Sequence, residues 1–145
     1  MENNYLESDW IVAEEKPKYS NDFLDDKDLP YKIIGICMDV HRTLGRGFRE
    51  VVYKDAIELE LKWRNISFER EKKYTIDYKG NILPHSYNAD FVVENQIILE
   101  VKAQVGIIED HYVQVINYLA VSKCPLALIV NFAGKSLEYK RIILT

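Results

Sequence analysis

The segment 89–102 reads ADFVVENQIILEVK, and it decides the fold. Two stretches rich in β-branched and aromatic residues, 86–93 and 97–101, stand on either side of the polar triplet 94–96. Such runs, separated by a short polar connection, predict two antiparallel strands joined as a hairpin. The second stretch is almost wholly apolar, which is typical of a strand buried within a sheet.

Opposed acidic residues follow from the register of this hairpin. If Val93 pairs with Ile97 across the turn, the same register places Asp90 opposite Glu100. Directly opposed residues point to one face with Cβ atoms about 4.5–5.5 Å apart, so the two carboxylates would repel each other. A divalent cation offsets such repulsion, and Lys102 shares the face of Glu100 because it lies two residues further along. We therefore expect two acids and an amine to converge.

This trio suits the hydrolysis of phosphodiesters. Mg²⁺ held by Asp90 and Glu100 would polarise a phosphate oxygen and lower the pKa of a water, while Lys102 would orient that water or neutralise developing charge. The alternative is that Glu100 and Lys102 form salt bridges on a half-exposed strand face, since Glu-x-Lys often arises by chance. The apolar neighbours of Glu100 favour the metal site, because a buried charge needs compensation.

Other patterns supply the elements around the hairpin. Helical spacing of apolar residues predicts helices at about 31–44, 48–63 and 108–122, the first two joined at Gly45 and Gly47. Strands are expected at 68–78, closed by the turn Lys79-Gly80-Asn81, and at 126–132 and 137–144. The order of helices, three strands, helix and two strands predicts one mixed α/β domain.

Length and composition fit a soluble globular domain. The chain has 145 residues, of which 48% are hydrophobic and 29% charged, and no apolar run approaches the roughly 20 residues that span a bilayer. The N-terminus lacks a basic leader and an apolar segment, so we expect a cytoplasmic protein without membrane contact. Cys37 and Cys124 lack zinc-ligand spacing and are expected to be reduced thiols.

Charge is distributed unevenly along the chain. Residues 1–29 hold nine acidic and three basic side chains, whereas residues 30–145 hold 14 acidic and 16 basic ones, for net charges of −6 and +2. We expect 1–29 to be an acidic, extended or partly disordered N-terminal arm and 30–145 to be the folded domain. The arm is either a solvated tail or a segment that covers the basic face until substrate displaces it.

Several motifs resemble one known family. Residues 47–53, GFREVVY, resemble the GxxExxY signature of small prokaryotic proteins assigned to the PD-(D/E)XK nuclease superfamily, whose hallmark is an Asp on one strand and Glu-x-Lys on the next. The resemblance extends from about Tyr31 to the C-terminus and includes VHRTLGRGF at 40–48, ADF at 89–91, EVKA at 100–103 and NF at 131–132. It implies a restriction-endonuclease-like α/β core in the order α-βββ-α-β, with a central mixed sheet flanked by helices, for the domain 30–145.

The resemblance also implies roles for residues outside the hairpin. Glu50 is expected to join the metal site from the preceding helix, its alternative being a solvated carboxylate. Gln114 and Tyr118 are four apart and share a helix face, and their spacing resembles the QxxxY element that positions nucleic acid in related nucleases. His41 and Tyr53 belong to the signature, and we interpret them as residues that support or pack behind the site. His111, near the face of Gln114, is expected to be an exposed histidine.

These observations predict a nuclease that depends on Mg²⁺ or Mn²⁺ and acts on nucleic acid, specifically DNA. Asp90, Glu100 and Glu50 would ligate the metal, and Lys102 would assist the nucleophile. The alternative is a catalytically silent module of the same fold that binds nucleic acid or a protein partner; a third is an interaction protein that assembles through its acidic arm. Because the chain is small, a homodimer, a partner protein, or single-stranded or branched substrate would supply affinity.

Overall fold

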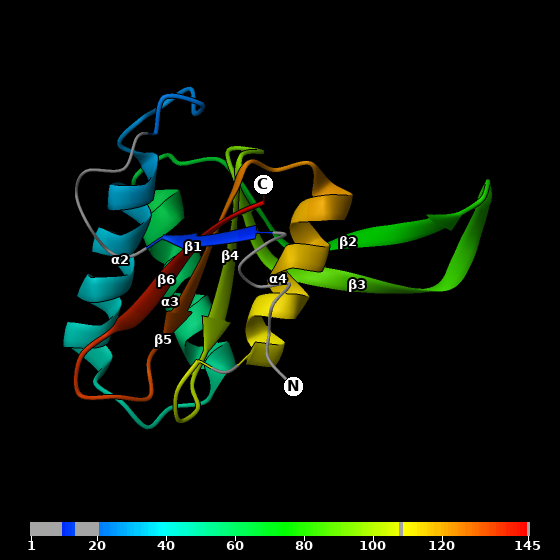
Figure 1. Cartoon of the computed structure of the whole chain (residues 1–145). Coiled ribbons are helices and arrows are strands. Elements are labelled where there is room, and N and C mark those ends of the chain that lie inside the picture. Colours follow the sequence, from blue (N-terminus) through cyan, green and yellow to red (C-terminus); the bar gives the residue numbers. More distant parts are fainter. Residues whose placement is uncertain (1–9, 14–20, 108, 145) are drawn as a thin grey trace.

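One six-stranded sheet organises the molecule. The computed structural model describes residues 10–13, 21–107 and 109–144, with helices against both faces of the sheet (Figure 1). The elements in chain order are β1 (Trp10–Ala13), α2 (Leu29–Leu44), α3 (Glu50–Trp63), β2 (Phe68–Tyr78), β3 (Asn81–Val93), β4 (Ile97–Lys102), α4 (Glu109–Ser122), β5 (Leu126–Asn131) and β6 (Glu138–Leu144). Among the described residues, no helix is both long and apolar enough to cross a membrane.

Strand order makes the sheet mixed. The strands lie in the order β1-β6-β5-β4-β3-β2, and β4 and β5 are the parallel pair, with α4 as the crossover between them. Both strands are almost completely buried, as expected for strands with a layer of helix on each side. The predicted α/β fold, restriction-endonuclease-like with the order α-βββ-α-β from α3 onward, is confirmed.

The hairpin register is the predicted one. Phe91 pairs with Leu99, Val92 with Ile98, and Val93 with Ile97. Tight packing on both faces fixes this register, because a slip by one residue would move every side chain to the opposite face. The regular ladder stops immediately before Asp90.

Two apolar layers enclose the sheet. On one face α2 and α3 pack Ile33, Ile36, Tyr53 and Ile57 against strand residues such as Leu99 and Leu128. On the other face α4 packs Val115, Tyr118 and Leu119 against strand residues such as Ile98 and Ile129. The strands that carry the site described below are therefore packed against helices on both faces.

The starts of two elements differ clearly from the sequence predictions. The second helix begins at Glu50 rather than near residue 48, because Gly47 has a φ of 112°, outside the helical region. The strand expected from 86 begins at Asn81, since the tight turn at Lys79-Gly80 lets β2 and β3 pair almost to their tips. Pro84 is tolerated there because it lies within the register shift opposite Thr75 and Asp77, where no ladder pair requires its missing N–H.

The N-terminal part contributes an unexpected strand. Trp10–Ala13 pair antiparallel with β6 as β1, and Leu24 is buried in the core on the α2 side. Residues 1–9 and 14–20 of the expected acidic arm lie outside the described residues, so its division from the domain stays a prediction. Cys37 and Cys124 are buried free thiols.

Candidate functional site

Asp90 and Glu100 are joined by hydrogen bonds across the hairpin of β3 and β4. The Asp90 N–H donates to Glu100 Oε2 at 2.8 Å, and the Val101 N–H donates to Asp90 Oδ2 at 2.8 Å. Each carboxylate thus bonds the backbone of the opposite strand just where the regular ladder ends. The sequence prediction brought the two acids together correctly, but backbone N–H groups rather than face-to-face carboxylates define their contact.

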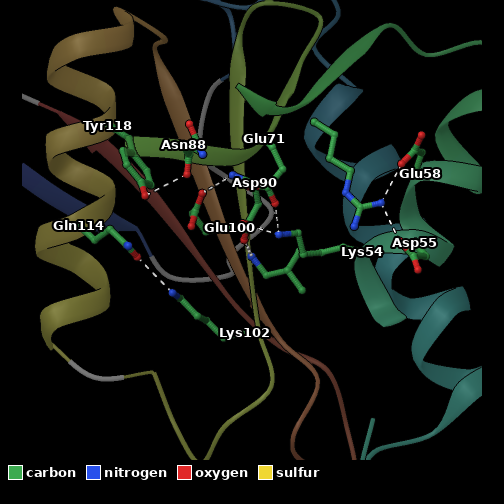
Figure 2. Close-up of polar contacts among 12 residues, drawn as sticks. Lys54, Asp55, Glu58, Glu71, Asn88, Asp90, Glu100, Lys102, Gln114 and Tyr118 are labelled. Carbon is green, nitrogen blue, oxygen red and sulfur yellow. Dashed lines mark hydrogen bonds and ion pairs between the residues drawn. The ribbon is translucent and has the colours of Figure 1, made fainter. Parts of the chain in front are cut away.

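A lysine from the helix layer completes the cluster. Lys54 on α3 donates to Asp90 Oδ1 at 2.9 Å and also forms an ion pair with Glu71 on β2, as Figure 2 shows. Because Arg70 pairs with Phe91 and Lys72 with Ala89, Glu71 lies level with Asp90, so three neighbouring strands carry an acid along one row. Desolvation alone would lower the pKa of Lys54, but its hydrogen bonds to Glu71 and Asp90 outweigh that effect and raise it.

Glu100 is the electrostatically unusual member of the cluster. Its side chain is 2% exposed, and burial raises its pKa to about 8, with the charge of Asp90 adding to the shift. The Asp90 N–H and the ammonium groups of Lys102 and Lys54 offset only part of this. The second oxygen, Oε1, accepts no hydrogen bond from any described residue. A charged Glu100 therefore lacks a full counter-charge within the described part of the protein.

Lys102 connects the strands to α4. Its ammonium donates to Gln114 Oε1 at 3.1 Å, so the expected neighbourhood of Gln114 and Lys102 is present. Tyr118 is buried, and its hydroxyl donates to the Asn88 carbonyl at 3.2 Å, two residues before Asp90. Burial, together with the charges of Glu100 and Asp90, raises the Tyr118 pKa, so the hydroxyl stays protonated and can act as a donor.

Glu50 lies apart from the cluster in this structure. It is the first residue of α3, one helical turn before Lys54, and no hydrogen bond or ion pair among the described residues joins it to Asp90, Glu100 or Lys102. Lys54 is the residue of this helix that reaches the site. Its position four residues after Glu50 was the available signal, because residues four apart share a helix face.

The two aromatic residues of the signature each hold a loop. The Tyr53 hydroxyl donates to the Gly45 carbonyl at 2.7 Å and accepts the Phe48 N–H at 3.2 Å, and its ring stacks on Phe132 at 4.3 Å. His41 is buried, stacks on the same Phe132 ring and bonds the Gly134 carbonyl through Nε2 at 2.9 Å. Tyr53 therefore fixes the connection between α2 and α3, whereas His41 ties α2 to the loop between β5 and β6.

His111 and two grooves lie around the site of Asp90, Glu100 and Lys102. The expectation of an exposed His111 is wrong: the residue is 7% exposed, and its Nε2 lies 3.0 Å from Nε2 of Gln104, which follows β4. A groove of about 320 Å³ is lined by Tyr87, Asp110, Val113, Gln114, Asn117 and Tyr118. A second of about 300 Å³ is lined by Arg46, Gly47, Phe48, Ala103 and Ala133.

The donor set fits a hard divalent cation with few protein ligands. No group of three His, Cys, Asp or Glu side chains is arranged as a metal cage within the ranges that the structure describes. Mg²⁺, however, commonly takes one or two carboxylates and completes its shell with water and substrate phosphate. Asp90 and Glu100 meet that requirement, and a cation would supply the counter-charge that an ionised Glu100 only partly has.

The comparison with protein-family models matches residues 27–142 to the PD-(D/E)XK nuclease superfamily. The chain belongs to that superfamily. The match spans the described elements from α2 to β6, including the strands that carry Asp90, Glu100 and Lys102. Most proteins of the PD-(D/E)XK nuclease superfamily are nucleases, although some are inactive.

Solved structures support the fold independently. The protein described as "Crystal structure of SSO0001" aligns with a TM-score of 0.53 at 19% sequence identity, over 64% of this chain and 48% of the other. The chain therefore spans about half the length of that protein, and the likeness concerns the fold alone. A search of curated proteins finds no match.

Proposed function

We propose that this protein is a nuclease that hydrolyses phosphodiester bonds in DNA with Mg²⁺ or Mn²⁺ as its cofactor, and that within the superfamily it is a GxxExxY protein. One observation carries the proposal: Glu100, buried and with its pKa raised to about 8, accepts the Asp90 N–H, while Asp90 accepts the Val101 N–H. Burying two adjacent acids costs free energy without a cation to compensate them. That cost is understandable where the pair serves chemistry.

Each residue of the site has a distinct proposed role. Asp90 and Glu100 would hold the cation, which when bound lowers the pKa of a water and stabilises charge on the phosphate. Lys102, on the same strand as Glu100, would orient the attacking water or donate to a phosphate oxygen. Gln114 holds the Lys102 ammonium in place, so its part in substrate binding would include setting the direction of that lysine.

The remaining candidates would act from the edges of the site. Tyr118 would contact substrate from the groove it shares with Gln114, while its hydroxyl fixes the backbone just before Asp90. Glu50 would reach the cation through a bridging water, since it makes no direct contact with the site here. Tyr53 would support the site through the loop that precedes Glu50, and His41 through the loop that follows β5.

Calorimetric titration with Mn²⁺ tests the metal ligands. We expect wild type to bind, and Asp90→Asn and Glu100→Gln each to abolish binding, because each change removes a charged oxygen ligand while preserving shape. Glu60→Gln on α3 is the matched control, since its carboxylate pairs with Arg64 outside the site. Equal binding by all four proteins would remove Asp90 and Glu100 as ligands.

A cleavage screen tests the reaction itself. Single-stranded, duplex and branched DNA, with RNA of the same sequences, would be incubated with Mg²⁺, Mn²⁺ or a chelator. We expect products from DNA with either metal, none with chelator, and none from Asp90→Asn. Metal binding without cleavage of any substrate would contradict a nuclease.

The Lys102→Ala variant separates chemistry from metal binding. Its ammonium contacts Gln114 rather than either acid, so we expect Mn²⁺ affinity near that of wild type. Cleavage should fall by about 10²–10³-fold, the usual loss when one electrostatic donor to a transition state is removed. Wild-type cleavage by this variant would leave Lys102 without its role.

A silent binding module of the same fold is the competing function. The observation in its favour is Lys54, whose ammonium already compensates Asp90 through Oδ1, the oxygen that does not accept the Val101 N–H. Such a module would bind nucleic acid or a protein partner equally well with chelator and with metal, and Asp90→Asn would leave that binding unchanged. The nuclease proposal instead requires cleavage that depends on the metal and on Asp90.

A further inference from the structure

The β2–β3 hairpin projects far beyond the rest of the sheet (Figure 1). Only Phe91–Val93 of β3 pair with β4, whereas the pairing of β2 with β3 continues outward to Tyr78 and Asn81. Residues 72–89, here called the extension, thus form a two-stranded ribbon. Such ribbons are marginal by themselves, so this one needs support at its base and a reason for its length.

One face of the extension is covered at its base, and the other is open and polar. Tyr74 pairs with Tyr87, and both pack beside α4, where the Tyr87 hydroxyl donates to the Asn117 carbonyl at 3.1 Å. On the opposite face Lys73 pairs with Asn88, and Thr75 with Ser86. All four of these polar side chains are exposed: Lys73, Thr75, Ser86 and Asn88.

The charge of the extension is positive although the whole chain is negative. It holds Lys72, Lys73 and Lys79 against a single acid, Asp77, in a protein with a net charge of −4. Lys73 and Lys79 form no ion pair with any described residue, and Lys79 lies 5.3 Å from the centre of the exposed Tyr78 ring. Unpaired lysines, hydroxyls and amides along a strand are the groups that contact phosphates.

The extension begins at the site and is long enough to follow a bound nucleic acid over several base pairs. β3 runs without interruption from Asn81 at the tip to Asp90 in the site. Nine residues at about 3.3 Å each give roughly 30 Å, close to the length of nine base pairs at about 3.4 Å per pair. Nucleic acid with one phosphate at Asp90 and Glu100 would therefore lie within reach of the whole extension.

We propose that the extension is a nucleic-acid-binding surface that holds the sugar-phosphate backbone of the flank on one side of the cleaved bond. This inference rests on the proposed nuclease function and adds to it the surface that supplies affinity. Because it contacts backbone, it confers no sequence preference. It also accounts for how a chain of 145 residues grips a substrate.

Salt-dependent binding tests the extension. Anisotropy of a labelled 30-base-pair DNA duplex would be followed against salt concentration with chelator present, so that no cleavage occurs. For Lys73→Ser/Lys79→Ser we expect weaker binding and a slope of log K against log salt that is smaller by about two, one for each lost phosphate contact. Lys27→Ser/Lys32→Ser is matched in charge and lies at the start of α2, away from the extension (Figure 1), so its slope should equal that of wild type.

Hydrogen exchange supplies a second measurement on unaltered protein. DNA should slow exchange at amides of the extension and leave those of α2 unchanged. A wild-type slope in the Lys73→Ser/Lys79→Ser variant, without protection of the extension, would overturn the inference while cleavage by wild type leaves the nuclease proposal intact. Unchanged DNA binding with a shift of wild-type dimer to variant monomer would overturn it in favour of self-association. Absence of both binding and cleavage in wild type would overturn both proposals.

Discussion

At the scale of single residues, Glu100 shows how burial and chemistry are linked. Its neighbours Leu99 and Val101 are inaccessible to solvent, and the carboxylate lies in the same low-dielectric layer. The two ways to stabilise it there are to protonate it or to bring a cation. In the absence of metal the first applies, because its pKa of about 8 exceeds neutral pH.

The pH dependence of stability follows from this shift. The folded pKa lies above the ordinary value near 4.3, so protonation favours the folded state, and this contribution is lost as the pH rises toward 8. With chelator present, the unfolding free energy of wild type minus that of Glu100→Gln should fall between about pH 4 and pH 8. Urea denaturation at several pH values measures it. Parallel profiles for the two proteins would contradict the buried, uncompensated carboxyl.

Lys54 and Glu71 make a second prediction at this scale. The Lys54 ammonium occupies Asp90 Oδ1, so a metal must displace or share it, and Glu71 can keep the displaced ammonium paired. Lys54→Met should therefore tighten Mn²⁺ binding by roughly tenfold, the equivalent of one pKa unit of charge interaction, and Glu71→Gln should weaken it.

Calorimetry measures both changes, with Lys62→Met as the control. Lys62 is on the same helix, but it pairs with Glu58 rather than with the cluster. Weaker binding by Lys54→Met would mean that the lysine supports the acids instead of competing for them.

At the scale of elements, the sequence predicted the hairpin better than its surroundings. Period-two patterns, a polar turn and apolar flanks all favour one register, so Asp90 and Glu100 could be placed together without a structure. Lys54 and Glu71 could not be found in this way. Lys54 lies on a helix, where its only signal was its position four residues after Glu50, and Glu71 has a φ of 56°, a local departure from strand geometry that period-two reasoning does not represent.

The loop between α2 and α3 gives an element-scale prediction. Tyr53→Phe removes the hydroxyl that satisfies the Gly45 carbonyl and the Phe48 N–H inside the protein. Stability should fall by about 1–3 kcal/mol, the usual result of leaving buried polar groups unpaired. Urea denaturation measures the loss, with the exposed Tyr31→Phe as control. Loss of activity at unchanged stability would instead assign Tyr53 to the chemistry.

At the scale of the whole molecule, the fold class was predictable because independent local patterns agree. The apolar spacing of each helix and strand, and their order along the chain, admit few arrangements other than a mixed sheet with helices on both faces. The strand β1 was not predictable, because Trp10–Ala13 is short and pairs with β6, at the other end of the chain.

Metal binding should also be visible in the stability of the whole protein. A cation that binds only the folded state raises the unfolding free energy by about 2.7 kcal/mol at one hundred times its Kd. Thermal denaturation with and without Mn²⁺ should therefore show a higher Tm for wild type and no change for Asp90→Asn. A similar rise in both proteins would locate the bound ion elsewhere.

The bond from the Val101 N–H to Asp90 Oδ2 has an evolutionary consequence. The Asp90 carboxylate replaces a missing ladder partner of the Val101 N–H. An inactive homologue that lost this carboxylate would therefore still lose stability. Selection for folding alone would then preserve the acids. Lys102 donates its hydrogen bond to a side chain on α4 rather than to the sheet, so it contributes less to the stability of the fold. Among homologues, the identity of the residue at the position of Lys102 should therefore distinguish active from inactive proteins better than the two acids do.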